Sequence, residues 1–251
     1  MNGNSNSDSG HPDDSFLRRD NDWQPPAFFE DYRSTHWRSP RHDLVRIPQT
    51  ASEVSGPLFA GIECGPLDHD LLHNFAQAGE CAVGQRLLVH GRVVDQNGRA
   101  LPNTLLEVWQ ANAGGRYRHC NEKYTAELDP NFAGCGRCLT DEQGCYRFYT
   151  VQPGAYPWPN GPNSWRPAHI HFSLFGEAFV QRLITQMYFE GDPLIPLCPI
   201  VNAIPDASGV ERLTARLDLD ATVPMDCLAY RFDIVLRGRQ QTPFENRLEG
   251  L

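Results

Sequence analysis

The chain has 251 residues, of which 40% are hydrophobic, and a formal net charge of −9. A chain of this length can bury the core of one large domain, and its 21 glycines and 20 prolines predict the many turns of a loop-rich β protein. The negative charge repels polyanions, and no cluster of lysines and arginines offers a surface for phosphates, so we expect no nucleic-acid partner.

The first residues lack the basic start and apolar run of a secretory signal, and no later stretch is apolar enough to cross a bilayer. The eight cysteines are too scattered for a disulfide scaffold. Cys135 and Cys138 form a C-x-x-C motif, but no second pair completes four thiolate ligands, so we interpret them as ordinary thiols beside a turn. These features predict a cytoplasmic protein with reduced thiols and no membrane partner.

The composition divides the chain into three parts. Residues 1–19 are mostly Asn, Ser, Asp and Gly, which bury too little apolar surface to fold, and they predict a disordered tail. Residues 20–85 contain aromatic residues and prolines without sustained periodicity. They predict an extended arm that packs on the core or on a partner, with a short helix at residues 70–75. Residues 86–251 predict a β-sandwich domain that would carry the functional site.

From residue 86 onward the hydrophobic pattern predicts an all-β fold. The pair Asn97-Gly98 accepts the positive φ of a tight hairpin turn, so residues 103–110 are expected to return beside residues 86–95. A second turn at residues 141–144 leads into another strand. The pattern as a whole predicts an antiparallel, prealbumin-like β-sandwich with long irregular loops and one or two short helices; its further strands are expected at residues 145–151, 168–175, 183–189 and 227–236.

One helix is expected among the later strands. Ser208 and Glu211 have the spacing of a capping box, in which the first side chain caps the helix and the second reaches back to the cap. Val210, Leu213 and Leu217 would then line one helical face.

His169 and His171 lie two residues apart in a predicted strand. Their side chains therefore project from the same face, where both imidazoles could bind one metal ion. A cupin-type site needs a third histidine downstream, and none follows His171. An iron(II) site with two histidines and a carboxylate could use Glu177, although Gly176 suggests an intervening turn. The pair could also be ordinary polar residues on a strand face.

Two tyrosines lie in loops whose glycines and prolines could fix the backbone: Tyr117 within GGRYRH and Tyr156 within PGAYP. Phenolates are hard anionic donors, and two of them with one hydroxide supply three negative charges that neutralise Fe³⁺. Each tyrosine could instead pack in a turn with a buried hydroxyl.

Four segments closely resemble the intradiol ring-cleaving dioxygenases: PNTLLEVWQANAGGRYRH, PGAYPWPNGPNSWRPAHIHF, ITQMYFEGDPLIPLCPIV and CLAYRFDIVLRG. The resemblance runs from about Asp31 to Asn246 and implies a non-haem Fe(III) enzyme that uses O2 to open a catechol between its hydroxyl-bearing carbons. The segment before Arg86 lacks the long amphipathic pattern of the catechol and hydroxyquinol branches, which favours the protocatechuate branch. There the implied reaction converts protocatechuate (3,4-dihydroxybenzoate) to 3-carboxy-cis,cis-muconate in the β-ketoadipate pathway of aromatic degradation.

The resemblance implies that Fe(III) is held by Tyr117, Tyr156, His169 and His171. It also implies a bound hydroxide that takes a proton from the catechol, with Tyr156 leaving the metal as the substrate chelates. Arg166 would stabilise negative charge that develops on the ring, whereas without the resemblance it would be interpreted as a surface arginine.

Four further positions match the substrate pocket of the family: Tyr32, near the substrate carboxylate, and Trp158, Gln186 and Ile200. Each alone would be interpreted as core or turn packing. Cys120, Cys135 and Pro159 depart from the family pattern near the ligand loops without replacing a ligand. Because of these departures, a dioxygenase with a different catechol substrate is the alternative to one that cleaves protocatechuate.

The same branch implies a partner, a similarly folded α chain without iron ligands, with the two chains assembling as (αβ)n. The arm at residues 20–85 suits such an interface. Two other functions fit parts of the sequence. GRVVDQNGRALPNTLLEVW and TDEQGCYRFYTVQPGAY also resemble a non-enzymatic, prealbumin-like binding module, and the histidine pair could belong to a zinc hydrolase.

Overall fold

The computed structural model describes residues 23–42, 63–176, 182–236, 238 and 241–244. The strands are β1 (Arg86–Val94), β2 (Leu105–Trp109), β3 (Cys135–Leu139), β4 (Cys145–Val151), β5 (Tyr156–Pro157), β6 (Trp165–Arg166), β7 (His169–Phe175), β8 (Arg182–Phe189), β9 (Thr214–Leu217), β10 (Leu228–Arg231) and β11 (Ile234–Val235). The short helices are α1 (Thr35–Arg38), the 3-10 turn η1 (Ile195–Leu197), α3 (Pro199–Asn202) and α4 (Ala207–Glu211).

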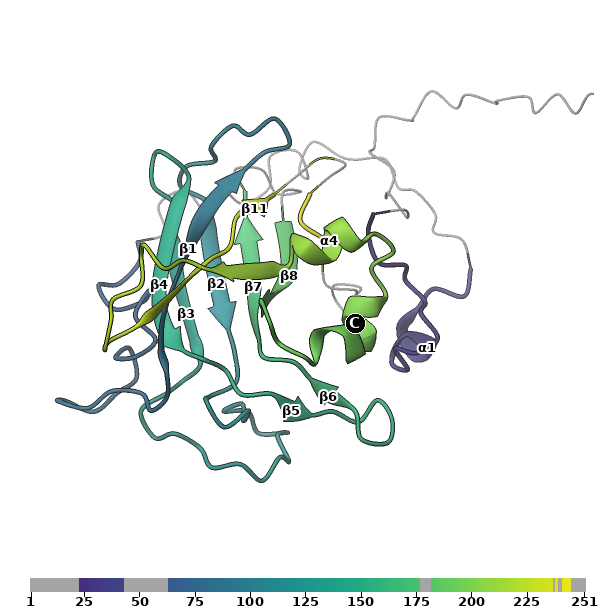
Figure 1. The fold of residues 1–251 in the computed structure, drawn as a ribbon, viewed down its shortest axis with the longest axis horizontal. Coiled ribbons are helices and arrows are strands. Elements are labelled where there is room, and N and C mark those ends of the chain that lie inside the picture. Colours follow the sequence, from purple (N-terminus) through teal and green to yellow (C-terminus); the bar gives the residue numbers. More distant parts are fainter. Residues whose placement is uncertain (1–22, 43–62, 177–181, 237, 239–240, 245–251) are drawn as a thin grey trace, which may run out of the picture.

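The main strands form two layers around one core (Figure 1). In one layer β1 pairs with β4, β10 and β11; in the other β8, β7, β2 and β3 follow in that order, and β9 joins the layers. Val89 and Phe148 from the first layer meet Leu106, Ile170 and Phe172 from the second. Burial of each such side chain contributes about 1.5–3 kcal/mol.

The predicted all-β sandwich with long loops and short helices is confirmed. Its strand pairs are mostly antiparallel, although β1 runs parallel to β10 and β11, and β8 runs parallel to β9.

The predicted hairpin between residues 86–95 and 103–110 is wrong. The tight turn itself is present, since Gly98 has a φ of 78° and its nitrogen donates to the Asp95 carbonyl at 3.0 Å. The chain then crosses to the other layer, so that β1 takes β4 as its antiparallel partner while β2 pairs with β3 and β7. Turn residues predict a local reversal, but burial of both strand faces decides the partner.

The predicted helix around Ser208 is only the five-residue α4, and its cap is Asp206. The Asp206 carboxylate accepts hydrogen bonds from the Ser208 hydroxyl and backbone nitrogen, which lower the pKa of this carboxyl group. Leu217, expected on the helical face, belongs to β9, because pairing with β8 and β10 satisfies the backbone there. The helix predicted at residues 70–75 is likewise wrong: Asp70 forms a bridge with Tyr149, and turns follow.

Two further strands differ from the sequence prediction. Residues 227–236 form β10 and β11 with a break at Phe232, whose carbonyl approaches Gly91 so closely that an added Cβ there would lie 1.9 Å from it. The C-x-x-C motif lies on β3 rather than beside a turn. Because strand side chains alternate, Cys135 is exposed whereas Cys138 is buried in the core, and both are free thiols.

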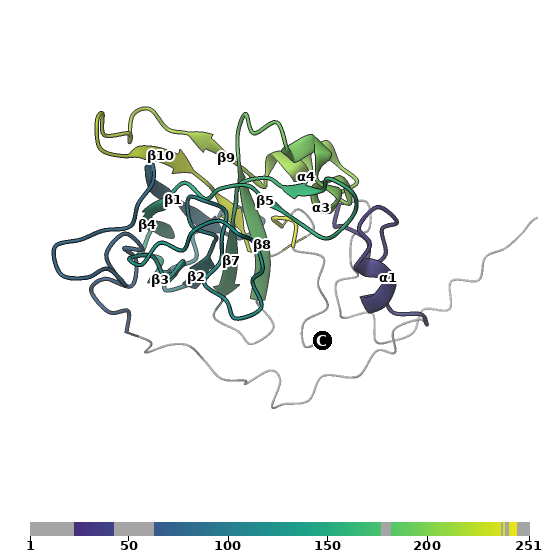
Figure 2. The same cartoon turned by 90° about the horizontal axis from the view of Figure 1, so that it is seen from below.

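Parts of the N-terminal region pack on the sandwich. Leu71 and Leu72 belong to its main core, while Tyr32 joins a second buried cluster near α3. Figure 2 shows α1 on the same side of the molecule as α3 and α4. The start of this region is bonded to the C-terminal segment, where the Trp23 indole nitrogen donates to the Gln241 carbonyl at 2.7 Å. The division into residues 1–19, 20–85 and 86–251 stays a prediction, and residues 1–19 lie outside the described part.

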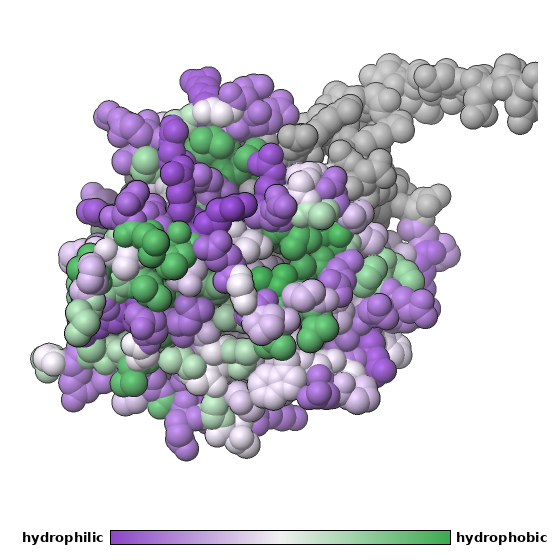
Figure 3. Space-filling view, viewed as in Figure 1, coloured by the Kyte–Doolittle hydropathy of each residue, from purple (hydrophilic) through white to green (hydrophobic). Residues whose placement is uncertain are grey.

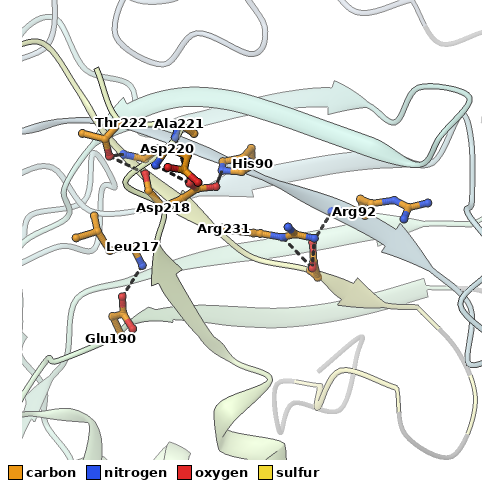
Figure 4. Close-up of polar contacts among 11 residues, drawn as sticks. His90, Arg92, Glu190, Leu217, Asp218, Asp220, Ala221, Thr222 and Arg231 are labelled. Carbon is orange, nitrogen blue, oxygen red and sulfur yellow. Dashed lines mark hydrogen bonds and ion pairs between the residues drawn. The ribbon is translucent and has the colours of Figure 1, made fainter. Parts of the chain in front are cut away.

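Polar contacts fasten the β9–β10 connection to β1 (Figure 4). One Asp218 carboxylate oxygen accepts from the backbone nitrogens of Asp220 and Ala221, and the other lies 3.1 Å from Nε2 of His90 on β1. Nearby, Arg231 forms an ion pair with Asp233. Such solvent-accessible pairs contribute about 0–1 kcal/mol each, so they fix the position of the connection more than they stabilise the fold.

The surface in Figure 3 is largely hydrophilic, with separate apolar areas. Among the described residues, no helix combines the length and apolar character that crossing a membrane requires.

Candidate metal and substrate site

Strand β7 is buried on both faces, and its outward face carries the histidine pair. Ile170 and Phe172 point into the sandwich core, so His169 and His171 project from the opposite face, where they are only 2% and 5% exposed. In the strand register, His171 lies beside Trp109 of β2 and opposite Gln186 of β8. The rigid strand therefore presents both imidazoles side by side, as the sequence predicted.

Two loops bring tyrosines to this face, and glycines let the loops touch. The Gly154 nitrogen donates to the Asn112 carbonyl at 3.0 Å. An added Cβ on Gly154 would lie 2.5 Å from the Gly115 nitrogen, and one on Gly115 would lie 2.4 Å from the Ala155 carbonyl oxygen. Because only glycine permits this approach, the loop with Tyr117 packs directly against the one with Tyr156.

The buried side chain of Asn112 holds the Tyr117 loop in shape. Its oxygen accepts hydrogen bonds from the backbone nitrogens of Gly114 and Arg116, both at 3.0 Å, and its nitrogen donates to the Glu127 carbonyl at 2.8 Å. Asn112 thereby closes the turn immediately before Tyr117, a role typical of Asn in turns.

The four predicted ligands are brought together. The phenol oxygens of Tyr117 and Tyr156 lie 3.5 Å and 3.4 Å from Nε2 of His169. Nδ1 of His169 lies 2.7 Å from the Pro167 carbonyl, which can only accept, so Nδ1 carries the proton and the lone pair of Nε2 faces the phenols. The His171 ring lies 4.9 Å from that of His169, centroid to centroid. Three side chains thus converge on one point, with His171 beside them.

Phenols are essential to any metal site at this pair. Within the described ranges, no three His, Cys, Asp or Glu side chains gather closely enough to hold a metal ion. Glu177, the carboxylate considered from the sequence, lies outside those ranges. Two phenols with two imidazoles form a hard, anionic donor set when the phenols are deprotonated, and such a set favours Fe³⁺.

Trp109 is part of this site, although sequence reasoning missed it. Its indole ring lies parallel to the His171 imidazole, with centroids 4.8 Å apart and an interplanar angle of 3°. The available signal was its position on the outward face of β2, since a large aromatic residue there needs a partner.

Arg166 is buried rather than a surface residue. It lies on β6 opposite Tyr156, its Nη2 donates to the Gln186 side-chain oxygen and to the Tyr188 hydroxyl, and its guanidinium carbon lies 5.6 Å from the Trp158 ring centroid. In the described structure, Nε of Arg166 and Nε2 of Gln186 are buried without a hydrogen-bond partner. Two adjacent unpaired donors indicate a place for a ligand oxygen, because buried donors are rarely left unpaired.

The surroundings keep Arg166 charged. Burial alone would lower its pKa, because the cation loses its hydration. The neighbouring phenols of Tyr188, Tyr156 and Tyr117 and the Cys198 thiol outweigh this effect, so the pKa of Arg166 is raised above its ordinary value. A permanent positive charge therefore lies beside the two tyrosine loops.

Two of the four predicted pocket residues, Trp158 and Gln186, contact Arg166, and the other two pack with them. Tyr32, Trp158 and Ile200 belong to one cluster, in which the Tyr32 ring meets the Trp158 ring edge to face with centroids 5.4 Å apart. Gln186 and Ile200 line the same narrow cavity. Their roles toward a substrate stay predictions.

The positions that depart from the family pattern lie around this centre. Cys120 and Pro159 are exposed in loops, and Cys135 is the partner of Trp109 across β2 and β3.

Comparisons with known proteins identify the family of the chain. A model of the family described as "Dioxygenase" matches residues 54–238, and one described as "Protocatechuate 3,4-dioxygenase beta subunit N terminal" matches residues 17–50. The protocatechuate 3,4-dioxygenase beta chain of Burkholderia cepacia is 50% identical over 226 residues, which cover 89% of this chain and 95% of that one.

More distant relatives belong to the same group. The protocatechuate 3,4-dioxygenase alpha chain of Pseudomonas putida is 31% identical over 79% of this chain and 96% of its own length. The crystal structure of 3-chlorocatechol 1,2-dioxygenase from Rhodococcus opacus superimposes with a TM-score of 0.51 and 28% identity, covering 72% of this chain and 69% of that one. Since the family model spans more than half of the chain and the beta-chain relative is similar almost end to end, this chain belongs to the intradiol dioxygenase family, which includes the protocatechuate 3,4-dioxygenase beta chains.

Proposed function

We propose that this chain binds Fe(III) and cleaves protocatechuate with O2 between its two hydroxyl-bearing carbons, giving 3-carboxy-cis,cis-muconate. The observation that carries the proposal is the approach of the Tyr117 and Tyr156 phenol oxygens to Nε2 of His169, beside His171. The name of the 50% identical beta chain supports the choice of substrate. An inert binding module would have no use for this arrangement.

The donor set fits ferric iron. Tyr117, Tyr156, His169 and His171 would hold it, with two anionic oxygens and two neutral nitrogens as ligands. A ferric ion held there would bind both catechol oxygens and make the ring reactive toward O2.

Tyr156 has the position of a proton acceptor. It lies partly exposed on the two-residue strand β5, whereas the histidines are fixed in the long buried strand β7. A Tyr156 phenolate can take up a catechol proton at its oxygen, which leaves the substrate oxygen anionic. The hydroxyl of Tyr156 can then turn toward solvent without disturbing β7.

Arg166 and Gln186 would bind the substrate beside the ring bond that is cleaved. Their unpaired Nε and Nε2 atoms can donate to substrate oxygens, and the permanent charge of Arg166 can stabilise negative charge that develops on the ring. Trp158 and Ile200 would cover the ring and exclude water, while the Tyr32 hydroxyl would donate to the carboxylate.

We also propose a partner. The relative named as an alpha chain is similar to this chain over nearly its whole length, which supports a pair of similarly folded chains. In the proposed assembly, (αβ)n, the α chain lacks the four ligands and the N-terminal arm of this chain contributes to the interface.

The test is the colour and oxygen uptake of the purified protein. Phenolate-to-iron(III) charge transfer should give a broad visible absorption band, which shifts in Tyr117→Phe and Tyr156→Phe but not in the control Tyr124→Phe, a loop tyrosine beside Trp165. Oxygen uptake with protocatechuate, catechol and hydroxyquinol, with and without a co-expressed α chain, identifies the substrate. A colourless, iron-replete protein contradicts the proposal, and tight zinc binding without a band would favour hydrolysis instead.

A further inference from the structure

The side chain of Asn160 joins the turn of the β5–β6 hairpin to the N-terminal arm. Its Nδ2 donates to the Asp31 carbonyl at 2.7 Å, and its Oδ1 accepts from the Arg33 nitrogen at 2.9 Å. The carboxamide thus pairs with the two peptide groups on either side of Tyr32. Asn160 is only 6% exposed, so water does not compete well for these bonds.

Tyr32 depends on this clamp for its position. Its own ring is buried against Trp158, with the Arg38 guanidinium 4.6 Å from the ring centroid, whereas the neighbours Asp31 and Arg33 are exposed. Local bonds close the turn around Tyr32, from its nitrogen to the Phe29 carbonyl and from Thr35 to its own carbonyl. The two bonds to Asn160 then fix this turn against the β5–β6 hairpin.

The hairpin that carries Asn160 also carries two residues of the proposed site. Tyr156 and Arg166 face each other across β5 and β6. The turn is tightened by bonds from the Trp158 nitrogen to the Ser164 carbonyl and from the Asn160 nitrogen to the Trp158 carbonyl. A residue in the turn can therefore set the distance between Tyr32 and the ring-binding side chains.

We propose that Asn160 is a positioning residue that fixes Tyr32 against Trp158 in the proposed substrate pocket and thereby selects catechols that carry a carboxylate. The inference rests on the proposed ring-cleavage function. The Tyr32 phenol is a hydrogen-bond donor and the guanidinium of Arg38 over its ring is cationic, so the surroundings of Tyr32 suit an anionic ring substituent. An unsubstituted catechol makes no such contact and gains nothing from the clamp.

The test compares Asn160→Ala and Asn160→Asp with the control Asn131→Ala, in the iron-loaded chain co-expressed with its α partner. Asp keeps the acceptor for the Arg33 nitrogen but places a second acceptor against the Asp31 carbonyl. Asn131 is equally buried, at 6%, but its side chain bonds to Gln77 and Glu80 instead of the arm.

Both Asn160 variants should raise KM for protocatechuate about 10-fold, because Ala removes both hydrogen bonds and Asp replaces one of them with repulsion between two acceptors. They should change kcat and the KM for catechol less than about 2-fold. The visible band should remain. In iron-free protein, amide exchange around Arg33 should become faster in Asn160→Ala and stay unchanged in Asn131→Ala, a readout that requires no activity.

The ratio of the KM for protocatechuate to the KM for catechol decides the proposal. An unchanged ratio in both variants overturns it, and so does loss of the visible band in both, since Asn160 would then support the ligand loop rather than the pocket. If the unmodified protein shows neither band nor ring cleavage, the proposed function fails; unchanged exchange around Arg33 would separately refute the clamp.

Discussion

The indole ring of Trp109 lies within 3° of parallel to the imidazole ring of His171, 4.8 Å away, across neighbouring strands of the outer sheet face. Stacking restricts rotation of the imidazole and covers one of its faces. Side chains that orient a metal ligand in this way typically change metal affinity about 10–100-fold when they are removed.

We therefore expect Trp109→Ala to lower iron affinity about 10-fold or more, while Trp109→Phe keeps most of it because a ring still stacks. Competition with an iron chelator, followed by the visible band, measures both. Trp37→Ala is the control, since Trp37 is 86% exposed on α1. Equal iron retention by Trp109→Ala and the unmodified protein would show that the stack does not position His171.

Gly154→Ala should disrupt the ligand centre. The new Cβ would lie 2.5 Å from both the Ala113 carbonyl oxygen and the Gly115 nitrogen, so the two tyrosine loops must separate. We expect loss of most of the visible band and a free energy of unfolding lower by about 1–3 kcal/mol. In the control Gly161→Ala, the nearest atom is the flexible Ser164 hydroxyl at 3.3 Å. A full-intensity band in Gly154→Ala would contradict the expected loop separation.

Arg166→Lys should leave the band intact but lower kcat about 10²–10³-fold. Lysine keeps the charge but cannot reproduce the planar donors that reach Gln186 and the proposed ligand. Oxygen-uptake kinetics at saturating substrate provide the measurement. The control is Arg182→Lys in β8; Arg182 stacks on Phe175 of β7, and this variant should retain kcat. If kcat of Arg166→Lys stays within a few-fold, Arg166 is not the charge stabiliser.

The two thiols of the C-x-x-C motif should differ in reactivity. Burial raises the pKa of Cys138 to about 12, whereas Cys135 is exposed on the same strand. Because thiolate is the reactive form, alkylation at pH about 8.5 should modify Cys135 rapidly and Cys138 only after unfolding. Similar rates at both positions would show that Cys138 is accessible, and a disulfide between them is not expected because they face opposite sides of β3.

The raised pKa of Cys138 also sets a pH dependence. Below its ordinary pKa of 9.0 the thiol is protonated in both states, so its contribution to stability is fully present. Between about pH 9 and pH 12 the unfolded chain releases this proton and the folded chain keeps it, so the free energy of unfolding falls by up to about 1.4 kcal/mol per pH unit. Cys138→Ala should make this decline shallower in urea titrations; an identical slope would refute the assignment.

Strands with clear alternation were predictable from the sequence. Residues 145–151 match β4 because inward Tyr146 and Phe148 alternate with outward polar residues. Strand β3 was missed because CGRCL has few β-branched residues and faces solvent on much of its surface; pairing with β2 makes it a strand. Strand partners depend on contacts between distant segments, so the local turn at Gly98 predicted the wrong one.

The site, like the fold, was predictable from the sequence only in part. Strand periodicity predicted that His169 and His171 share a face, and loop glycines with the family resemblance indicated Tyr117 and Tyr156. The contacts of Asn160 span more than 120 positions in sequence, at separations of 127 and 129, and no local pattern reports them. Trp109 acquires its role only through its register against β7.

The bond between Trp23 and Gln241 has a consequence for biosynthesis. Translation begins at the N-terminus, and 218 positions separate the two residues, so the arm leaves the ribosome long before its anchor exists. The Phe244 nitrogen, which donates to the Gln24 side chain, adds a second late anchor. The start of the arm can therefore reach its final position only late, whereas the contacts of Tyr32 with Trp158 and Asn160 can form earlier. We expect a chain ending at residue 236 to acquire the iron colour, while amide exchange around Trp23 and Gln24 becomes faster than in the full chain.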